Sequence, residues 1–537
     1  MMKKLVVLFV ALVASLSVVA AECVIVPLPV SYEAQKGSVV LSPKTVVYVA
    51  DKSLMRPATM FCANVAAEKG LQLSVVEGIA PSKGAIALSV DKLYAEEAYV
   101  LEITKSGVVI KGGSEKAVFY GLQSLRQVVF HAKAKGENVV LPCMVVEDKP
   151  HFGYRGGMLD VCRYFFNVEE VKKFIDILAL HKMNRFHWHL TEDQGWRIEI
   201  KKYPNLTKVG SVRKETGVGR NNLTNFDGKP YGGYFTQDEV REVVRYAAER
   251  YIDVIPEIDM PGHMVAALAS YPELGCNRGP YEVRTRWGIS KDVLCAGRES
   301  TFEFVEGVLS EILELFPSKY IHVGGDECPK DRWKLCPDCQ KRIQEEGLKD
   351  EFELQSYFIH RVEKFLAKHG RSLVGWDEIL EGGISKTATI MAWRGAHRGI
   401  EAAKLGNEVI MTPKHFCYLD YANTSDHDKN NEPLCGGGNG KRPLPLRKVY
   451  SFDPYDQLNE YERTFVKGVQ GNMWTEYVPN FNHVQHMVLP RLAAIAEVGW
   501  TYGEKNYDDF ARRMHLLRKL YDKCGFNYAP YFFNGIE

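Results

Sequence analysis

The chain has 537 residues, of which 46% are hydrophobic, 11% aromatic and 25% charged, close to the averages of soluble globular proteins. This composition argues against a disordered, collagen-like or coiled-coil chain, and the balance of 68 Lys and Arg against 67 Asp and Glu argues against a nucleic-acid-binding protein. The length is enough for roughly two to four domains, so a large soluble enzyme is the expected class.

The first 21 residues resemble a secretory signal peptide. Two lysines precede an apolar run, which ends in the small residues Ala20 and Ala21. We therefore expect cleavage after Ala21 and an exported protein, periplasmic or extracellular. A membrane anchor is the alternative, because the run is close to the length that spans a bilayer. Glu22 stands where a bacterial lipoprotein signal has a small residue, which argues against lipidation of Cys23, and no later segment predicts a membrane span.

Residues 22–148 form the first predicted domain. Apolar residues run or alternate at strand length in 39–50 and 98–113, and the second segment is expected to form a hairpin around Ser106. Residues 115–132 carry apolar residues at helical spacing. These elements predict a small α+β domain without obvious catalytic chemistry.

Residues 149–503 show a different pattern, in which apolar strand-like segments alternate with amphipathic helices. Eight such units predict an α/β protein with a (β/α)8 TIM barrel and long insertions. A doubly wound open sheet is the rival architecture, but no glycine-rich phosphate turn follows the first strand. Residues 504–537 contain one further helix, expected to pack on the barrel as a C-terminal extension. The expected barrel strands are 156–161, 185–190, 251–258, 320–325, 372–376, 389–393, 408–413 and 468–474.

All 12 cysteines follow the expected cleavage point, which allows disulfides in an oxidising compartment. Cys276 and Cys295 flank a loop-like stretch and are the best candidates for a disulfide. Cys336 and Cys339 form a CxxC motif, with Cys328 nearby, that suits a metal or a redox disulfide. A zinc site would need a fourth ligand, and none follows at a suitable spacing. We therefore favour a structural role for these cysteines and expect no metal.

The predicted strand ends carry the side chains that point to chemistry, because catalytic groups of a (β/α)8 barrel come from the C-terminal ends of its strands. Trp376, Trp393 and Trp474 follow three different strands although the chain has only 8 Trp. A single Trp at such a place is more often part of the core, but several at one level favour a sugar, whose C–H faces stack on indole rings. The full set is Asp160, Arg163, His187, His189, Glu192, Asp193, Glu257, Asp259, His263, Asp326, Glu327, Trp376, Asp377, Glu378, Trp393, Arg394, Tyr418, Asp420, Trp474 and Glu476.

The sharpest local motif is His-Val-Gly-Gly-Asp-Glu at 322–327. Its two glycines allow a tight turn and the close approach of a ligand, and two adjacent carboxylates follow at once. In a poorly solvated pocket, repulsion and desolvation should raise the pKa of one carboxyl group and create a general acid that works near neutral pH. The alternative is a surface pair that caps the next segment.

With these motifs in place, the chain resembles the family 20 glycoside hydrolases, which are β-N-acetylhexosaminidases. The matching segments follow the order of the family and span most of the predicted barrel, and the N-terminal part resembles the small α+β domain that usually precedes it. The segments are GYRGGMLDVCRYFF (153–166), LHKMNRFHWHLTEDQGWRIEI (180–200), PEIDMPGH (256–263), HVGGDE (322–327), GWDEIL (375–380), MAWRG (391–395), YLDY (418–421) and NMWTEY (472–477).

This resemblance implies substrate-assisted, retaining hydrolysis, in which the 2-acetamido oxygen of the sugar attacks the anomeric carbon and gives an oxazolinium-type intermediate. It implies that Glu327 is the general acid and base and that Asp326 orients the acetamido group. His263 would join a polar relay with an acid near Glu192 and support Glu327. The remaining substrate-binding residues that it implies are Arg163 and Glu476 for the hydroxyls of the terminal sugar, Trp376, Trp393 and Trp474 for the walls and floor of the pocket, Tyr418 for the acetamido oxygen, and Asp420 for the leaving or terminal sugar.

Two positions depart from the usual family pattern. The family often has Asp where this chain has Glu192, and His where it has Tyr164. The first departure makes the relay less sure, and both bear on fine specificity. Neither changes Asp326 or Glu327, so we expect an exo-acting enzyme that releases terminal, non-reducing β-linked GlcNAc or GalNAc.

Two rival functions remain open from the residues alone. The His187-Trp-His189 segment could form a metal-binding pair, because alternate residues of a strand share a face, as in a metal-dependent amidohydrolase on the same barrel. A non-catalytic glycan-binding protein on a decayed hydrolase scaffold is the second, but it would have lost one of the acids. The expected partner is a glycan with a terminal N-acetylhexosamine, with no cofactor, nucleic acid or membrane span, and a homodimer stays open.

Overall fold

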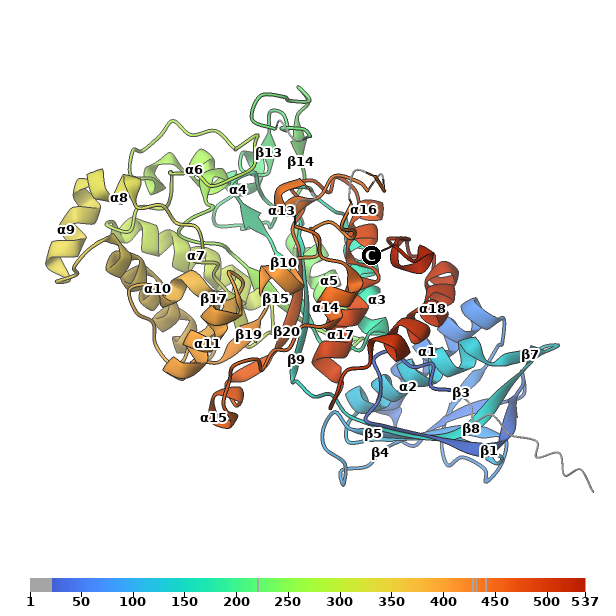
Figure 1. Ribbon diagram of the computed structural model, residues 1–537. Helices are drawn as coiled ribbons and strands as arrows, with labels where there is room; N and C mark the ends of the chain where they lie inside the picture. The colour runs from blue at the N-terminus through green and yellow to red at the C-terminus, as the bar shows by residue number, and fades with distance from the viewer. Residues whose placement is uncertain (1–21, 220–221, 427–428, 431, 440–441, 537) are drawn as a thin grey trace, which may run out of the picture.

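The computed structural model describes residues 22–536 except 220–221, 427–428, 431 and 440–441, so the expected signal peptide lies outside the described residues. The described chain forms a small N-terminal domain and a large barrel, with the last long helix lying against both (Figure 1). This arrangement confirms the predicted fold class, a (β/α)8 barrel preceded by a small α+β domain.

The small domain is a mixed sheet with two helices, α1 (Met55–Lys69) and α2 (Glu115–His131), on one face. The expected hairpin forms from β5 and β6, which pair antiparallel. The buried side of α2 and the buried residues of the strands form one core, as their apolar periodicity predicted. In sheet order the strands are β1 (Ser31–Leu41), β8 (Asn138–Asp148), β5 (Tyr99–Thr104), β6 (Gly107–Gly112), β4 (Ala85–Val90), β2 (Val46–Val49) and β3 (Ser74–Glu77), and β7 (Lys133–Lys135) pairs with β8.

Eight parallel strands close the barrel, and each overlaps one of the eight predicted segments. These strands are buried on both faces, since side chains fill the interior and helices cover the outside, which explains why they are continuous apolar runs. In chain order they are β9 (Tyr154–Asp160), β10 (Arg185–His189), β15 (Asp253–Glu257), β16 (Tyr320–His322), β17 (Ser372–Trp376), β18 (Thr389–Ala392), β19 (Val409–Met411) and β20 (Val466–Met473).

Helices cover the outside of the barrel. Asn167 and Thr236 begin two of them with capping boxes, in which the side chain accepts from the backbone three residues later and a Glu at that position bonds back. The apolar stretch before Trp500 forms two helices rather than one, because Pro490 has no N–H to continue the first. The main outer helices are α3 (Val168–Leu180), α5 (Gln237–Ala248), α7 (Glu299–Leu315), α10 (Glu351–Lys368), α11 (Ala396–Leu405), α16 (Phe481–Val488) and α17 (Arg491–Trp500).

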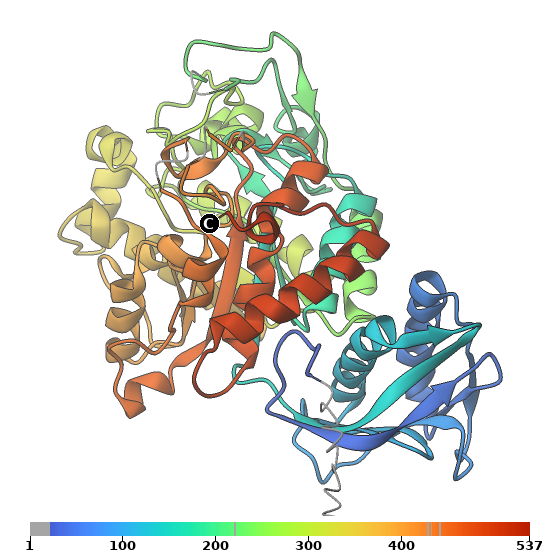
Figure 2. The same cartoon turned by 45° about the vertical axis from the view of Figure 1, so that its right-hand side comes forward.

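The C-terminal extension contains α18 (Tyr507–Cys524), which lies across the junction of the two domains (Figure 2). On the barrel side, Arg513 donates to Glu497 of α17 at 2.6 and 2.7 Å. On the other side, Arg126 of α2 donates to Cys524 at 3.3 Å. The helix therefore contacts both the barrel and the small domain, whereas the sequence analysis placed it against the barrel only. In the part of the chain that the structure describes, no helix is long and apolar enough to cross a membrane.

The cysteine expectations need correction. All twelve cysteines lie within the described residues and none is disulfide-bonded, so the expected Cys276–Cys295 disulfide is wrong. Both residues instead lie in one cluster with Cys336 and Cys339, whereas Cys328 is outside it. The sequence argument failed because it sought further ligands only after the CxxC motif, while the fold brings them from an earlier loop.

Candidate active site

All eleven site residues inferred from the sequence lie at one end of the barrel. Parallel strands place their C-terminal ends on the same side, so residues far apart in the chain become neighbours. They follow the strands in this order: Arg163 after β9, Glu192 after β10, His263 after β15, Asp326 and Glu327 after β16, Trp376 at the end of β17, Trp393 after β18, Tyr418 and Asp420 after β19, and Trp474 and Glu476 after β20.

The turn after β16 positions the two adjacent carboxylates. Gly324 has φ +66°, and a Cβ there would lie 1.7 Å from Oδ1 of Asp259; Gly325 has φ +94°, and a Cβ there would lie 2.4 Å from Ile379. Only glycine avoids both the clash and the left-handed strain. The turn brings Asp326 against the pocket, with its side chain 12% exposed, while Glu327 remains 34% exposed.

Two of the residues in the site have strained backbones. Glu327 has φ +42° and His263 has φ +52°, a region that side-chain-bearing residues adopt at a cost of about 1–3 kcal/mol. Such strain persists where the surrounding structure fixes it, and it is concentrated at functional sites. The backbone therefore holds this acid and this imidazole in one arrangement.

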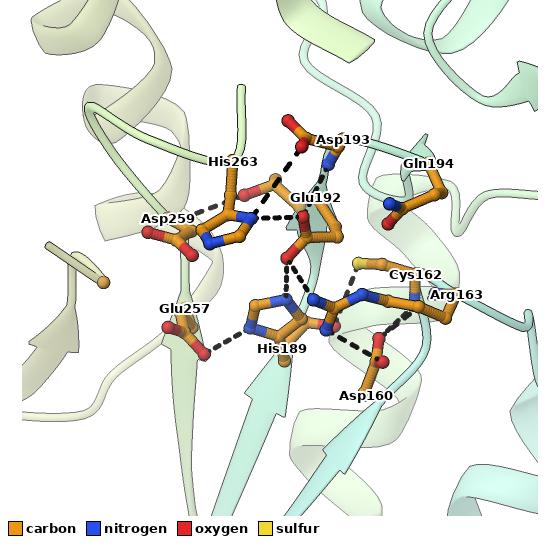
Figure 3. Close-up of polar contacts among 12 residues, drawn as sticks. Asp160, Cys162, Arg163, His189, Glu192, Asp193, Gln194, Glu257, Asp259 and His263 are labelled. Carbon is orange, nitrogen blue, oxygen red and sulfur yellow. Dashed lines mark hydrogen bonds and ion pairs between the residues drawn. The ribbon is translucent and has the colours of Figure 1, made fainter. Parts of the chain in front are cut away.

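A charged network connects His263 through Glu192 to Arg163 (Figure 3). Nδ1 of His263 lies 2.7 Å from Oε1 of Glu192, whose other oxygen lies 3.0 Å from Nη2 of Arg163. Nε2 of His263 lies 3.5 Å from Glu327 Oε2 and 3.8 Å from Asp326 Oδ2. The longer side chain of Glu192 therefore still reaches the histidine.

The network sets the charges of its members. Burial alone would raise the pKa of Glu192, but the neighbouring Arg163 and His263 hold it well below the ordinary value. Burial alone would lower the pKa of His263, but the Glu192 carboxylate raises it well above 6.5. An imidazolium ion therefore faces the two carboxylates after β16 near neutral pH.

The pKa of the Asp326 carboxyl group is raised above its ordinary value. Burial is the main cause, Glu327 contributes by repulsion and His263 opposes them, and the pKa reaches about 7. The sequence predicted that one of the pair would be raised and would thereby become the general acid. That reasoning points to Asp326, whereas the family resemblance assigns the role of general acid to Glu327. Oδ1 of Asp326 is buried and has no hydrogen-bond partner among the described residues.

Aromatic rings form one side of the pocket. Trp376 is buried and donates from Nε1 to Oε1 of Glu257 at 2.8 Å. Its ring centroid lies 5.8 Å from that of Trp474, which in turn lies 6.3 Å from Tyr418. Tyr418 stacks on the partly buried Trp393 at 5.9 Å and 14°. The four rings therefore form one continuous aromatic cluster.

Arg163 lies between this aromatic cluster and several acidic side chains. Its guanidinium lies 4.9 Å from the centre of Trp474 and its Nη1 donates to Oδ2 of Asp160 at 3.1 Å. Burial raises the pKa of both Asp420 and Glu476. Repulsion by Glu476 adds to the shift of Asp420, while for Glu476 the neighbouring Arg163 opposes the shift and Asp160 adds to it. The fork of Arg163 and these acids can bind several sugar hydroxyls at once.

Two site residues received no role from the sequence. Glu378 accepts from Nε1 of Trp393 at 2.9 Å, and burial together with Asp326 raises its pKa to about 8. Glu257 accepts from Trp376 and from both histidines of the His-Trp-His segment, and so supports the floor of the pocket. Their positions at strand ends were the available signal, but only the contacts reveal what they support.

The side chains of His187 and His189 contact other buried side chains of the barrel. Nε2 of His187 bonds to Glu257 at 2.9 Å and Nδ1 accepts from Gln470 at 3.0 Å. His189 bonds to the same Glu257 through Nδ1, and its Nε2 lies 3.4 Å from Glu192. The two histidines therefore belong to a buried polar network with Glu257, Gln470 and Glu192.

Tyr164, the second departure, lies at the rim. Its ring contacts Tyr231 at 5.5 Å and Trp287 at 5.8 Å between centroids, and the guanidinium of Arg213 lies 5.6 Å from its centre. This aromatic cluster packs the inserted loops against each other beside Arg163.

Comparison with known families gives two matches that together cover almost all described residues. Residues 152–502 match the model described as glycosyl hydrolase family 20, catalytic domain, and residues 22–149 match the model of domain 2 of the same family.

Curated proteins and solved structures agree with these matches. The chain is 46% identical over 513 residues to a beta-hexosaminidase of Porphyromonas gingivalis, a match that covers 94% of this chain but only 64% of that protein. It is 37% identical over 440 residues to a beta-hexosaminidase of Akkermansia muciniphila, covering 80% of this chain and 85% of that protein. It is similar, with a TM-score of 0.84 and 30% identity, to a GH20 exo beta-N-acetylglucosaminidase from Vibrio harveyi in complex with N-acetylglucosamine, covering 94% of this chain and 78% of that chain.

Proposed function

This chain belongs to glycosyl hydrolase family 20, and on that premise we propose that it is an exo-acting β-N-acetylhexosaminidase that removes terminal, non-reducing β-linked GlcNAc or GalNAc from glycans. The names of its relatives support this substrate class. The observation that carries the proposal is the pair of neighbouring acids, one buried and one accessible, between an imidazolium and a set of aromatic rings.

The proposed reaction uses the substrate's own amide as nucleophile. The acetamido carbonyl oxygen attacks the anomeric carbon while Glu327 gives its proton to the leaving glycosidic oxygen, which leaves an oxazolinium-type intermediate. Glu327 then takes a proton from water, and the water oxygen attacks the anomeric carbon. This attack breaks the bond to the acetamido oxygen and opens the oxazolinium ring, so the product keeps its β configuration. Proton transfer of this kind contributes about 10²–10⁴-fold to a rate.

Asp326 would accept a hydrogen bond from the acetamido N–H and balance the charge that develops on the intermediate. Its unpartnered buried oxygen suits this contact, and the His263 imidazolium 3.8 Å away favours the ionised form that the contact needs. Binding energy that holds the attacking oxygen in place offsets part of the entropy cost of reaching the transition state. This positioning can lower the activation free energy by several kcal/mol.

The leaving group would lie on the more open side of Glu327. A groove of about 350 Å³ begins there. Its lining includes charged and apolar side chains that suit a second sugar, namely Ile289, Lys330, Phe352, Glu378, Glu381 and Arg394. The N-terminal segment supports export, so we place the substrate outside the cytoplasm.

Chromogenic β-glycosides test the proposal. Wild type should hydrolyse the GlcNAc and GalNAc substrates and leave the glucose substrate almost untouched, because glucose lacks the acetamido nucleophile. Glu327→Gln should lower kcat about 10²–10⁴-fold, and Asp326→Asn should impair the same substrates. Glu169→Gln on the exposed side of α3 serves as the matched control and should keep full activity. Equal rates on glucose and GlcNAc substrates, or a fully active Glu327→Gln, would overturn the mechanism.

A further inference from the structure

Four cysteines from two segments of the chain meet at one point away from the acids of the pocket. Cys276 and Cys295 flank an inserted loop after β15, and Cys336 and Cys339 lie at the start of α9 (Pro337–Glu345), the helix at the left edge of Figure 1. Their sulfur atoms all lie within 4.8 Å of one another. Cys295, Cys336 and Cys339 are buried, and Cys276 is partly buried.

Three of the six sulfur–sulfur distances in the cluster agree with those of a tetrahedral metal site. Sγ of Cys295 lies 3.6 Å from that of Cys339 and 3.7 Å from that of Cys336, and Sγ of Cys276 lies 3.8 Å from that of Cys339. Zinc bonds to thiolate sulfur at about 2.3 Å, so two sulfurs of a tetrahedral site lie about 3.8 Å apart. The cluster therefore has room for one metal ion at its centre.

Groups of positive charge or polarity lie beside the cluster. Cys336 and Cys339 lie at the N-terminal end of α9, where the helix dipole stabilises negative charge. The backbone N–H of Gly297 donates to Cys295, and the positive charge of Arg298 acts on Cys295 and Cys336. These groups offset the net charge of −2 that four thiolates and one divalent cation would carry.

The chain also brings the two segments very close. A Cβ on Gly297 would lie 2.2 Å from the backbone carbon of Asp338 and 2.4 Å from the backbone nitrogen of Cys339. Any side chain at this position would push the CxxC motif away from Cys295. Glycine therefore permits the contact that completes the cluster.

We propose that Cys276, Cys295, Cys336 and Cys339 bind one structural zinc ion. A closed site of four cysteines leaves no open position for substrate, as is usual for structural zinc, and sulfur ligands in this geometry select zinc or iron. Loading replaces the four thiol protons with one Zn²⁺ and releases those protons to solvent.

The ion would anchor the rim of the active site. The loop between Cys276 and Cys295 contacts the pocket, where Arg284 lies 3.3 Å from Asp193, and it carries Ile289, which lines the groove beside Glu327. Zinc would fix both ends of this loop to α9. The metal thus supports the part of the site where a leaving group would lie, without touching the reacting atoms.

Metal analysis of the purified full chain tests the proposal. Produced with zinc in the medium and purified without a metal-affinity tag, the wild type should hold about one zinc per chain, and the Cys295→Ser/Cys336→Ser variant less than about a tenth of that. Cys62→Ser, which changes a buried cysteine of α1 outside the cluster, should retain about one zinc. Cobalt in place of zinc should give the visible absorption bands of a tetrahedral thiolate site.

Several outcomes would overturn the proposal, and the wild type alone suffices should the double variant fail to fold. A wild-type protein without zinc, iron in its place, or an intact mass lower by four hydrogens, which indicates two disulfides, would each refute it. Equal zinc in the wild type and in a folded double variant would do the same. Since the metal content is read without an activity assay, failure here is distinct from failure of the proposed hydrolase function.

Discussion

Glu192→Gln tests whether the charged network controls the acids of the active site. The substitution keeps the size of the side chain but removes its negative charge. Oε1 of Glu192 lies 2.7 Å from His263, and this carboxylate is the main influence that raises the histidine's pKa against burial. Without it, His263 should be neutral at neutral pH, and the positive charge facing Asp326 and Glu327 should disappear.

The size of the effect follows from the distance. At an effective dielectric constant of about 20, two opposite charges about 4 Å apart attract by about 4 kcal/mol, or roughly 3 pKa units, which is an upper limit once the site relaxes. A loss of this size moves His263 from charged to neutral within the working pH range. We expect kcat to fall about 10²-fold, the lower end of what a proton-transfer step contributes.

The assay is the pH profile of kcat and KM on a chromogenic GlcNAc substrate. Glu192→Gln should change the shape of the kcat profile, whereas Glu192→Asp, which keeps the charge, should keep the shape at a lower rate. His263→Phe completes a double-mutant cycle. If Glu192 acts through His263, the kcat of the double variant should be about as low as that of His263→Phe alone, because both substitutions remove the same interaction.

Two results would refute this reasoning. A Glu192→Gln enzyme with the wild-type kcat and pH profile would show that the relay has no influence. Independent losses that multiply to about 10⁴-fold in the double variant would show that Glu192 acts by another route, such as Arg163.

Two further predictions concern stability. Gly324→Ala should lower the free energy of unfolding by at least about 3 kcal/mol, because its Cβ would lie 1.7 Å from Asp259. Gly347→Ala is the control: Gly347 has φ +65° and nothing within 4 Å, so this substitution should lower the free energy of unfolding by only about 1 kcal/mol. Equal losses for the two variants in denaturant titrations would contradict the clash. Burial lowers the pKa of His189, but the Glu257 carboxylate overcomes this and raises it to about 10, so its contribution to stability is full below about pH 6.5 and is lost as the pH rises through 10. The Tm of wild type should therefore fall between about pH 7 and pH 10 by more than that of His189→Asn, and parallel curves would count against this origin.

The sequence determined the fold class and the list of candidate site residues. Buried parallel strands are apolar on both faces and outer helices on one, so their alternation is visible without coordinates, and each of the eight predicted strands is present. The motif at 322–327 likewise predicted a tight turn, since glycine adopts the left-handed backbone conformations that Gly324 and Gly325 show.

Only the tertiary structure decided how those residues act on one another. A pKa depends on burial and on charges from other strands, so the sequence could not say that burial would raise the pKa of Asp326 to about 7. The same reason hid the role of Glu378, whose partner Trp393 follows a different strand.

The cysteines show the limit most clearly. The sequence analysis paired Cys276 with Cys295 because the two flank one loop. Their spacing in the sequence does not show which other cysteines lie near them in the folded chain. The cluster exists because the loop after β15 and the start of α9 approach closely at Gly297, a contact between segments about 40 residues apart that no local pattern encodes. Strands, helices and turns depend mainly on neighbouring residues and can be predicted from the sequence. Sites built from several segments depend on how the chain packs and are seen only in the tertiary structure.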